Sequence, residues 1–211
     1  MRRPPEPLRF AAVVGEAVSG PAAALREVVV PGRLAVPALD VGERDRILVT
    51  GVNGSGKSTL LGVLAGTVAA QGAVHRRRGL RIGLLAQDVA PARPGTAREV
   101  YAAAAGPDAV PLRELGLIAP RDVDRPLAAL SVGQRRRVEL AVLVARSPQL
   151  LLLDEPTNHL SPALADELED ALGTGPGAVV LASHDRWLRR RWTGREVALT
   201  GDGRMAGCPA T

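Results

Sequence analysis

The sequence is poor in cysteine and in aromatic residues, and each scarcity excludes a class of site. Its one cysteine, Cys208, can form neither an internal disulfide nor a cysteine-rich zinc site, so we expect a reducing, cytoplasmic setting. The four aromatic side chains, Phe10, Tyr101, Trp187 and Trp192, are too few for the stacking surfaces that hold single-stranded nucleic acid. The core must therefore be built from leucine, valine and alanine.

Long hydrophobic runs are absent as well. None approaches the ~20 apolar residues that span a bilayer. The apolar stretch from Phe10 to Val14 stops at Gly15, too soon for a signal peptide, so we expect no direct insertion into a membrane. With 211 residues, 46% hydrophobic and 23% charged, the composition predicts one globular domain over residues 1–211.

Short apolar runs alternate between strand-like and helix-like patterns, which indicates an α/β fold. Residues 88–130 differ, being rich in proline, and we expect a helical lobe at about 88–145 inserted into the α/β core. Two capping boxes are predicted, Thr96 with Glu99 and Ser131 with Gln134. Strands are predicted at 8–14, 25–30, 46–50, 80–86, 150–153 and 178–183, and helices at 57–65, 100–105, 132–145 and 163–172.

Lysine is nearly absent: the 27 basic residues are arginines except for Lys57. It lies in the run Gly51-Val-Asn-Gly-Ser-Gly-Lys-Ser58, which has the spacing of a phosphate-binding P-loop between a strand and a helix. The glycines let backbone N–H groups turn toward a phosphate, and Lys57 would reach the β- and γ-phosphates of a nucleotide. The alternative is a glycine-rich turn that only caps a helix. The residues expected to hold ATP are Gly51, Asn53, Gly54, Ser55, Gly56, Lys57, Ser58 and Thr59.

A second motif is the apolar run Leu150–Leu153 followed by Asp154 and Glu155. It puts two carboxylates at the carboxyl edge of a sheet, where α/β proteins bind ligands. Asp154 would support Mg²⁺ together with the hydroxyl of Ser58, and Glu155 would deprotonate the attacking water. Alone, such a pair is usually a solvated strand end.

Three further motifs resemble those of the ABC ATPases. The run Leu130-Ser-Val-Gly-Gln134 resembles their signature, Leu-Ser-Gly-Gly-Gln, while Gln87 and His184 look like the Q-loop glutamine and the switch histidine. Alone, Gln87 could be a solvated side chain and His184 a packed histidine. The five motifs stand in the family's order. The resemblance implies that Gln87 senses Mg²⁺ and the water, that His184 contacts the γ-phosphate, and that Ser131, Gly133 and Gln134 complete the ATP site of a second ABC domain.

The implied fold is that of a P-loop NTPase of the ABC type: a RecA-like parallel-sheet core, an N-terminal antiparallel β lobe and a small helical lobe. The run Asn158-His159-Leu160 after Glu155 narrows the resemblance to the ABC-F class, in particular to the second ATPase domain of actinobacterial resistance proteins that protect ribosomes from macrolides. ATP, Mg²⁺ and a ribosomal or rRNA partner are then expected. The alternative is the ATP-hydrolysing subunit of a membrane transporter, and a third reading is a silent module that uses ATP only to pair.

The sequence departs from the family pattern at several places. Val132 replaces a signature glycine and Ser161 replaces the D-loop aspartate. Phe10 is the only aromatic residue upstream of the P-loop, and we do not assign it to adenine. There is one P-loop and one signature, so the chain is half of a larger protein, a split product or an obligate homodimer.

The net charge of +5 permits an acidic partner such as RNA. Three arginine clusters could touch ribosomal phosphates, although such runs are more often solvated faces. They are 76–78, 135–137 and 189–191.

Overall fold

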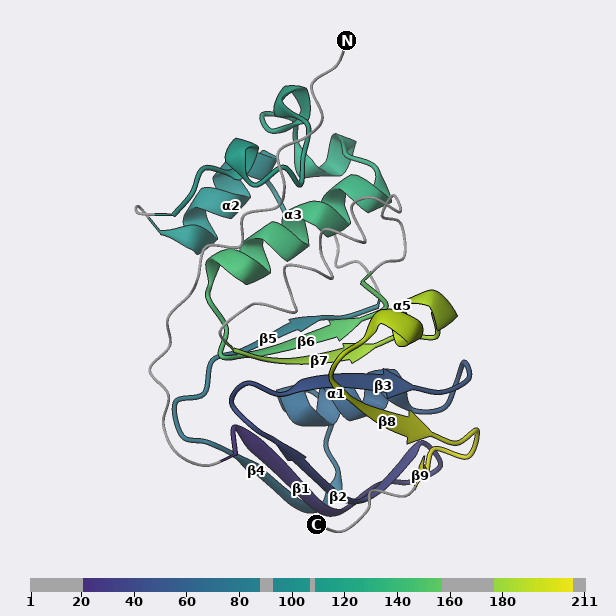
Figure 1. The fold of residues 1–211 in the computed structure, drawn as a ribbon. Helices are drawn as coiled ribbons and strands as arrows, with labels where there is room; N and C mark the ends of the chain where they lie inside the picture. The colour runs from purple at the N-terminus through teal and green to yellow at the C-terminus, as the bar shows by residue number, and fades with distance from the viewer. Residues whose placement is uncertain (1–20, 88–92, 107–108, 157–176, 207–211) are drawn as a thin grey trace. The chain divides into compact units, whose positions relative to one another are not determined.

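A computed structural model describes residues 21–87, 93–106, 109–156 and 177–206, which fall into two compact units (Figure 1). The helical unit comprises the described residues 93–106 and 109–147. The sheet unit comprises 21–87, 148–156 and 177–206. Within these residues no helix is long and apolar enough to cross a membrane.

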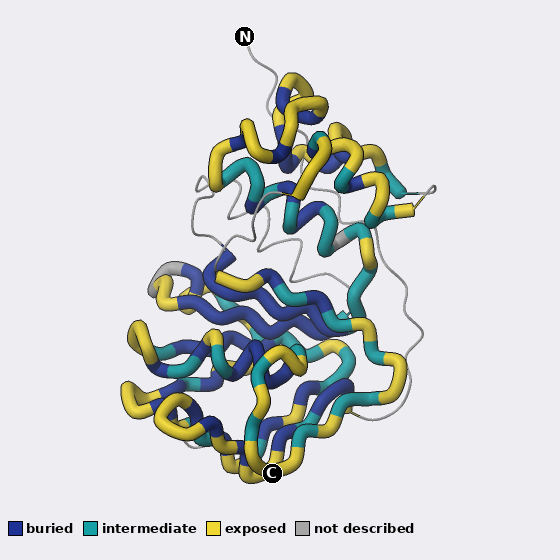
Figure 2. The backbone as a smooth tube through the Cα atoms, turned by 180° about the vertical axis from the view of Figure 1, so that it is seen from behind, coloured by how far each residue is buried: buried dark blue, intermediate teal, exposed yellow. Residues whose placement is uncertain are grey.

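A mixed six-stranded sheet forms the core of the sheet unit. Its first five strands are parallel, and the last is antiparallel to its neighbour. Every residue of the runs Leu150–Asp154 and Ala178–Ala182 is buried, as expected for strands covered on both faces (Figure 2). In order across the sheet the strands are β5 (Ile82–Leu85), β6 (Leu150–Asp154), β7 (Ala178–Ala182), β3 (Arg46–Thr50), β8 (Arg195–Leu199) and β9 (Met205–Ala206).

A second, antiparallel sheet confirms the β lobe that the resemblance implied. Its order is β2 (Leu34–Val41), β1 (Ala23–Val30) and β4 (Gln71–Arg76). We did not predict β2, because Pro37 reads as a strand breaker. The strand tolerates Pro37 because β2 is at the edge of this sheet, and its pairing with β1 skips from Ala38–Arg26 to Val36–Val28.

The skipped position in β1 is an irregularity that also shapes β4. Glu27 has a positive φ of 47°, and the β1–β4 register shifts between Arg26 and Val29. Gly72 of β4 faces this bulge with φ 90°, and a Cβ there would overlap the Glu27 carbonyl. We did not predict β4, because glycine inside a short strand weakens the strand pattern. Only glycine fits at position 72, however, because the bulge lies against it.

Helix α1 (Lys57–Ala65) lies between the two sheets (Figure 1). Leu60, Leu61, Val63 and Leu64 are fully buried, so the helix is apolar on all sides beyond its first turn. It ends at Gly66, whose φ of 83° is left-handed. The Nε of Arg76 donates to the carbonyl of Leu64 at 2.8 Å and satisfies one of the last-turn acceptors.

The helical unit packs α2 (Ala97–Ala105) and α3 (Val132–Ala145) with three short 3₁₀ turns. Both predicted capping boxes are confirmed: in the first, the amide of Glu99 donates to Thr96 Oγ1 at 3.2 Å and the amide of Thr96 to Glu99 Oε2 at 2.8 Å. The second opens α3 and is described with the signature below. The turns are η1 (Leu112–Glu114), η2 (Pro120–Asp122) and η3 (Leu127–Ala129).

Several expectations lie outside the described residues. They are the strand at 8–14 with Phe10, the helix at 163–172, the run Asn158-His159-Leu160, Ser161 and Cys208. One short helix, α5 (Arg186–Arg191), was not predicted.

Candidate functional site

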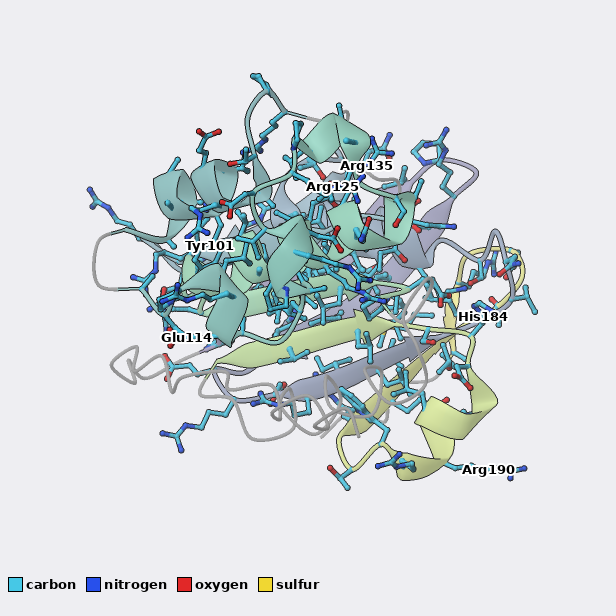
Figure 3. All side chains as sticks on the ribbon, turned by 90° about the horizontal axis from the view of Figure 1, so that it is seen from above. Tyr101, Glu114, Arg125, Arg135, His184 and Arg190 are labelled. Atoms are coloured by element: carbon cyan, nitrogen blue, oxygen red, sulfur yellow. The ribbon has the colours of Figure 1, made fainter. Side chains whose placement is uncertain are left out.

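The sheet unit gathers most of the expected site residues at one edge. The P-loop follows β3, Gln87 follows β5, and Asp154 ends β6. His184 lies beyond β7 (Figure 3). These four strands are neighbours and parallel, with Leu153 opposite both Leu85 and Leu181. Their carboxyl ends therefore meet, and this is the edge at which open α/β sheets bind ligands.

The P-loop backbone depends on its glycines. Gly54 and Gly56 have φ of 82° and 88°, in the left-handed region. A Cβ on Gly56 would overlap the carbonyl of Arg33, and one on Gly51 would lie 2.6 Å from the carbonyl of Leu199. The loop is thus held tightly between the β1–β2 hairpin and the end of β8. Asn53 and Gly54 are exposed at its tip.

The helix that follows the loop presents bare N–H groups. Its N-cap is Gly56, no side chain caps it, and its first turn has no acidic residue. Uncapped amides and the helix dipole favour an anion at this end. Ser58 is exposed in the first turn, and Thr59 behind it is half-buried.

Lys57 is only 7% exposed and curls over the loop. Its Nζ donates to the carbonyl of Gly51 at 2.9 Å and to that of Val52 at 3.2 Å. Beside it, the buried Oγ of Ser55 has no hydrogen-bond partner among the described residues. These features together fit a bound phosphate chain: two positions where only glycine fits, uncapped amides, the buried ammonium of Lys57 and the hydroxyl of Ser55.

Asp154 and Glu155 are both buried, at 3% and 6% exposure. Glu155 has a positive φ of 46°, which a non-glycine residue adopts only when its surroundings hold it there. Its amide donates to the carbonyl of Ala182 at 2.9 Å. The backbone thereby turns the Glu155 side chain out of the line of β6.

The Glu155 carboxylate is bound at both oxygens. His184 Nδ1 lies 2.7 Å from Oε1, and Ser183 Oγ lies 3.4 Å from Oε2. The His184 side chain is 55% exposed, so the pair joins a buried carboxylate to solvent. Gln87 is also exposed at this edge, immediately after β5. The edge thus combines a buried carboxylate and an exposed imidazole with a loop that fits a phosphate chain.

Ser131, Gly133 and Gln134 belong to the helical unit instead. There the amide of Gln134 donates to Ser131 Oγ at 3.2 Å, and the amide of Ser131 donates to Gln134 Oε1 at 2.9 Å. Val132 is 45% exposed beside them. The signature is therefore a rigid, capped turn at the start of α3.

Sequence analysis missed two residues that hold these motifs. Asp122 of η2 is 5% exposed and accepts from Gln134 Nε2 at 2.9 Å and from Arg125 Nη1 at 3.0 Å. Nothing in the sequence marks it. Ser183 is 1% exposed, and its only signal was a polar residue directly before His184 at the end of an apolar strand.

The arginine clusters are largely structural. Arg76 caps α1, Arg77 pairs with Glu43, and the 3%-exposed Arg136 lies 3.6 Å from Glu139. Arg189 Nη2 lies 2.7 Å from Glu196 Oε1. Arg190 is exposed (Figure 3).

Comparison with known proteins identifies the family. A family model described as "ABC transporter" matches residues 35–158. Over 184 residues the chain is 48% identical to the tylosin resistance ATP-binding protein TlrC of Streptomyces fradiae, covering 85% of this chain and 33% of the relative. It is 31% identical to the ribosome protection protein VmlR of Bacillus subtilis, covering 75% and 30%. It is 39% identical to ABC transporter F family member 4 of Arabidopsis thaliana, covering 72% and 22%.

The chain thus spans a third or less of the length of these relatives. A solved structure shows the same fold with a TM-score of 0.72 at 23% identity, covering 88% of this chain and 97% of the other. It is the ATP-binding cassette MJ0796, dimeric and bound to ADP and Pi. The family match covers more than half of the chain, and the relatives favour the ABC-F class over a transporter subunit. The chain therefore belongs to the ABC family of ATP-binding cassettes, in its ABC-F class.

Proposed function

We propose that this chain binds ATP with Mg²⁺ at the edge of its six-stranded sheet and hydrolyses it when a second ABC domain closes over the site. The observation that carries the proposal is the Glu155–His184 pair, 2.7 Å apart, at the same sheet edge as the P-loop. A phosphate cradle without a base would bind nucleotide and do no more. A base at that edge gives the bound nucleotide a water-activating group.

The P-loop holds the phosphates. The bare amides at the start of α1 receive phosphate oxygens, and Lys57 exchanges its loop carbonyls for the β- and γ-phosphates. Gly51 and Gly56 let the loop pack in this position, because any side chain there would collide with the neighbouring backbone or with Ser55. Asn53, Gly54, Ser55 and Thr59 complete the cradle.

The oxygen ligands present fit a magnesium ion. Ser58 offers a hydroxyl and Asp154 a carboxylate, with Gln87 as an amide oxygen. No group of three or more His, Cys, Asp or Glu side chains in the described chain could hold a metal by itself. That suits Mg²⁺, which is usually bound by few protein ligands together with phosphates and water. When bound, it would neutralise charge on the phosphates.

Glu155 is the base in this proposal. Its carboxylate accepts a proton from the attacking water, while the exposed His184 contacts the γ-phosphate and Gln87 orients the water. Both oxygens of Glu155 are held, so the carboxylate needs little reorganisation before it acts. With the Glu155 carboxylate as the acceptor, His184 Nδ1 is the donor of their hydrogen bond.

Pairing would be with another cassette, supplied by a second copy or by the rest of a longer protein. Ser131, Gly133 and Gln134 would close on the partner's nucleotide. The uncapped N–H groups of one cassette form half of an ATP site. The signature turn of the other cassette would form the other half. ATP binding then closes the pair, hydrolysis reopens it, and the attached assembly changes shape.

We further propose that this assembly acts in the cytoplasm on the ribosome. Relatives named for tylosin resistance and for ribosome protection support this, as does the net charge of +5. The arginines with structural partners contribute little to it. Arg78 and Arg190, both exposed, remain available for phosphate contacts.

The test is the mass of the Glu155→Gln chain by sedimentation, with and without Mg²⁺ and ATP. The variant keeps the cradle but removes the base, so ATP should hold the closed state. We expect ATP binding to persist and steady hydrolysis to fall about 10²–10⁴-fold. Doubling of mass only with ATP would identify a self-pairing cassette.

The matched control is Lys57→Ala combined with Glu155→Gln, which should neither bind ATP tightly nor pair. A monomer that binds ATP but never pairs points to a different partner domain and rules out the homodimer. Normal turnover by Glu155→Gln would reject Glu155 as the base.

A further inference from the structure

We infer that Ser183 is a positioning residue that holds the Glu155 carboxylate in place, an inference that rests on the proposed role of Glu155 as base. Ser183 is not among the residues proposed above to contact the nucleotide or the attacking water. It acts through the carboxylate, in concert with His184. Two contacts, one at each oxygen, would stop the carboxylate from rotating.

The contacts around Ser183 leave its hydroxyl proton a single acceptor among the described residues. Ser183 is 1% exposed, and its amide donates to the carbonyl of Val49 at 3.1 Å, which anchors it to β3. Its Oγ accepts from the amide of Asp185 at 3.1 Å. A buried hydroxyl also needs an acceptor for its own proton. Glu155 Oε2, 3.4 Å away, is that acceptor.

The contact at Oε2 matters because His184 holds only Oε1 of the Glu155 carboxylate. His184 Nδ1 binds Oε1 at 2.7 Å, but one hydrogen bond leaves a carboxylate able to pivot, because the terminal torsion of glutamate is broad. The His184 side chain is 55% exposed, so water can compete for its hydrogen bond. Ser183 is buried and tied to the sheet through its backbone. It is therefore the rigid half of the clamp.

Three variants separate this role from a packing role. Ser183→Ala and Ser183→Cys both keep a small side chain, and neither has a strong donor. Ser183→Thr retains the hydroxyl and adds one methyl group. Thermal unfolding of each variant checks that the fold is intact. A positioning role predicts that Ala and Cys fail together and that Thr restores function.

The first readout needs no turnover: the NMR signal of the His184 Nδ1 proton in the nucleotide-free chain, assigned by its loss in His184→Gln. In the parent chain we expect the 2.7 Å hydrogen bond to Glu155 to place this proton downfield. We expect it to shift upfield or broaden in Ser183→Ala and Ser183→Cys and to be retained in Ser183→Thr. An unchanged signal in Ser183→Ala overturns the inference.

The second readout is turnover against binding. Ser183→Ala should lower kcat about 10-fold, as expected for loss of a hydrogen bond to a charged group, with ATP affinity unchanged within about twofold. In a Glu155→Gln background it should cause no further loss. A matching loss of affinity, or an additive loss, overturns it. If the parent chain and Glu155→Gln turn over ATP equally, the proposed function fails, and the His184 signal still decides the role of Ser183.

Discussion

Lys57 is set apart from the other basic residues by its side chain and by its place in the P-loop. It is the one lysine among 27 basic residues, and it is buried in a loop whose carbonyls bind its ammonium at 2.9 and 3.2 Å. A compact ammonium fits between such closely spaced oxygens, whereas a planar guanidinium does not. The composition alone marked this residue, and its surroundings give the physical reason.

We expect Lys57→Ala to lower ATP affinity about 10- to 100-fold, since it removes charge-assisted hydrogen bonds to the phosphates. Titration with a fluorescent ATP analogue measures this. Lys57→Arg is the matched control: it keeps the charge, and because of its shape we expect it to restore affinity only in part. Unchanged affinity in Lys57→Ala would contradict the cradle assignment.

At the scale of elements, the start of α3 depends on a residue from another turn. Ser131 and Gln134 cap each other, and the side-chain Nε2 of Gln134 donates to Asp122 of η2. Arg125 binds the same carboxylate. The signature turn is therefore tied to η2 as well as to its own helix.

Asp122→Ala should lower the free energy of unfolding of the helical unit by about 1–3 kcal/mol, because it leaves polar groups of Gln134 and Arg125 without their partner. Urea denaturation measures the change. Asp124→Ala is the matched control. A hydrogen bond from Arg98 holds the pKa of Asp124 below its usual value, but the pair is exposed, so we expect a much smaller effect. Equal effects from the two variants would show that Asp122 has no special role.

At the scale of the whole molecule, one apolar helix joins the two sheets of the sheet unit. Side chains of α1 share a single buried core with β1 and β2 on one side and with β6 and β7 on the other. The P-loop opens this helix. Packing of the core therefore sets the position of the nucleotide cradle.

Leu61→Ala should destabilise the sheet unit by about 2–5 kcal/mol, because Leu61 is fully buried and the cavity cannot collapse between two sheets. Urea unfolding should show loss of structure and loss of nucleotide binding in one transition. Val29→Ala, at a site that is 38% exposed, should change stability far less. Separate transitions for structure and binding would argue against a shared core.

Elements that carry strong local signals could be predicted from the sequence. The strand 46–50 and the helices 57–65 and 132–145 were predicted with the bounds that the structure shows, because glycine turns and capping residues mark their ends. The order of the motifs also identified the family. Each of these signals lies within a few neighbouring residues.

Other features depend on contacts that form only when the chain folds. Pro37 is compatible with a strand only because β2 is at an edge, and Gly72 fits β4 only because a bulge faces it. The contacts of Ser183 and His184 with Glu155, and of Asp122 with Gln134, join residues that are far apart in the chain. Such contacts depend on strand order and on burial. A hydroxyl or carboxylate acquires an obligatory partner only once folding has removed it from water.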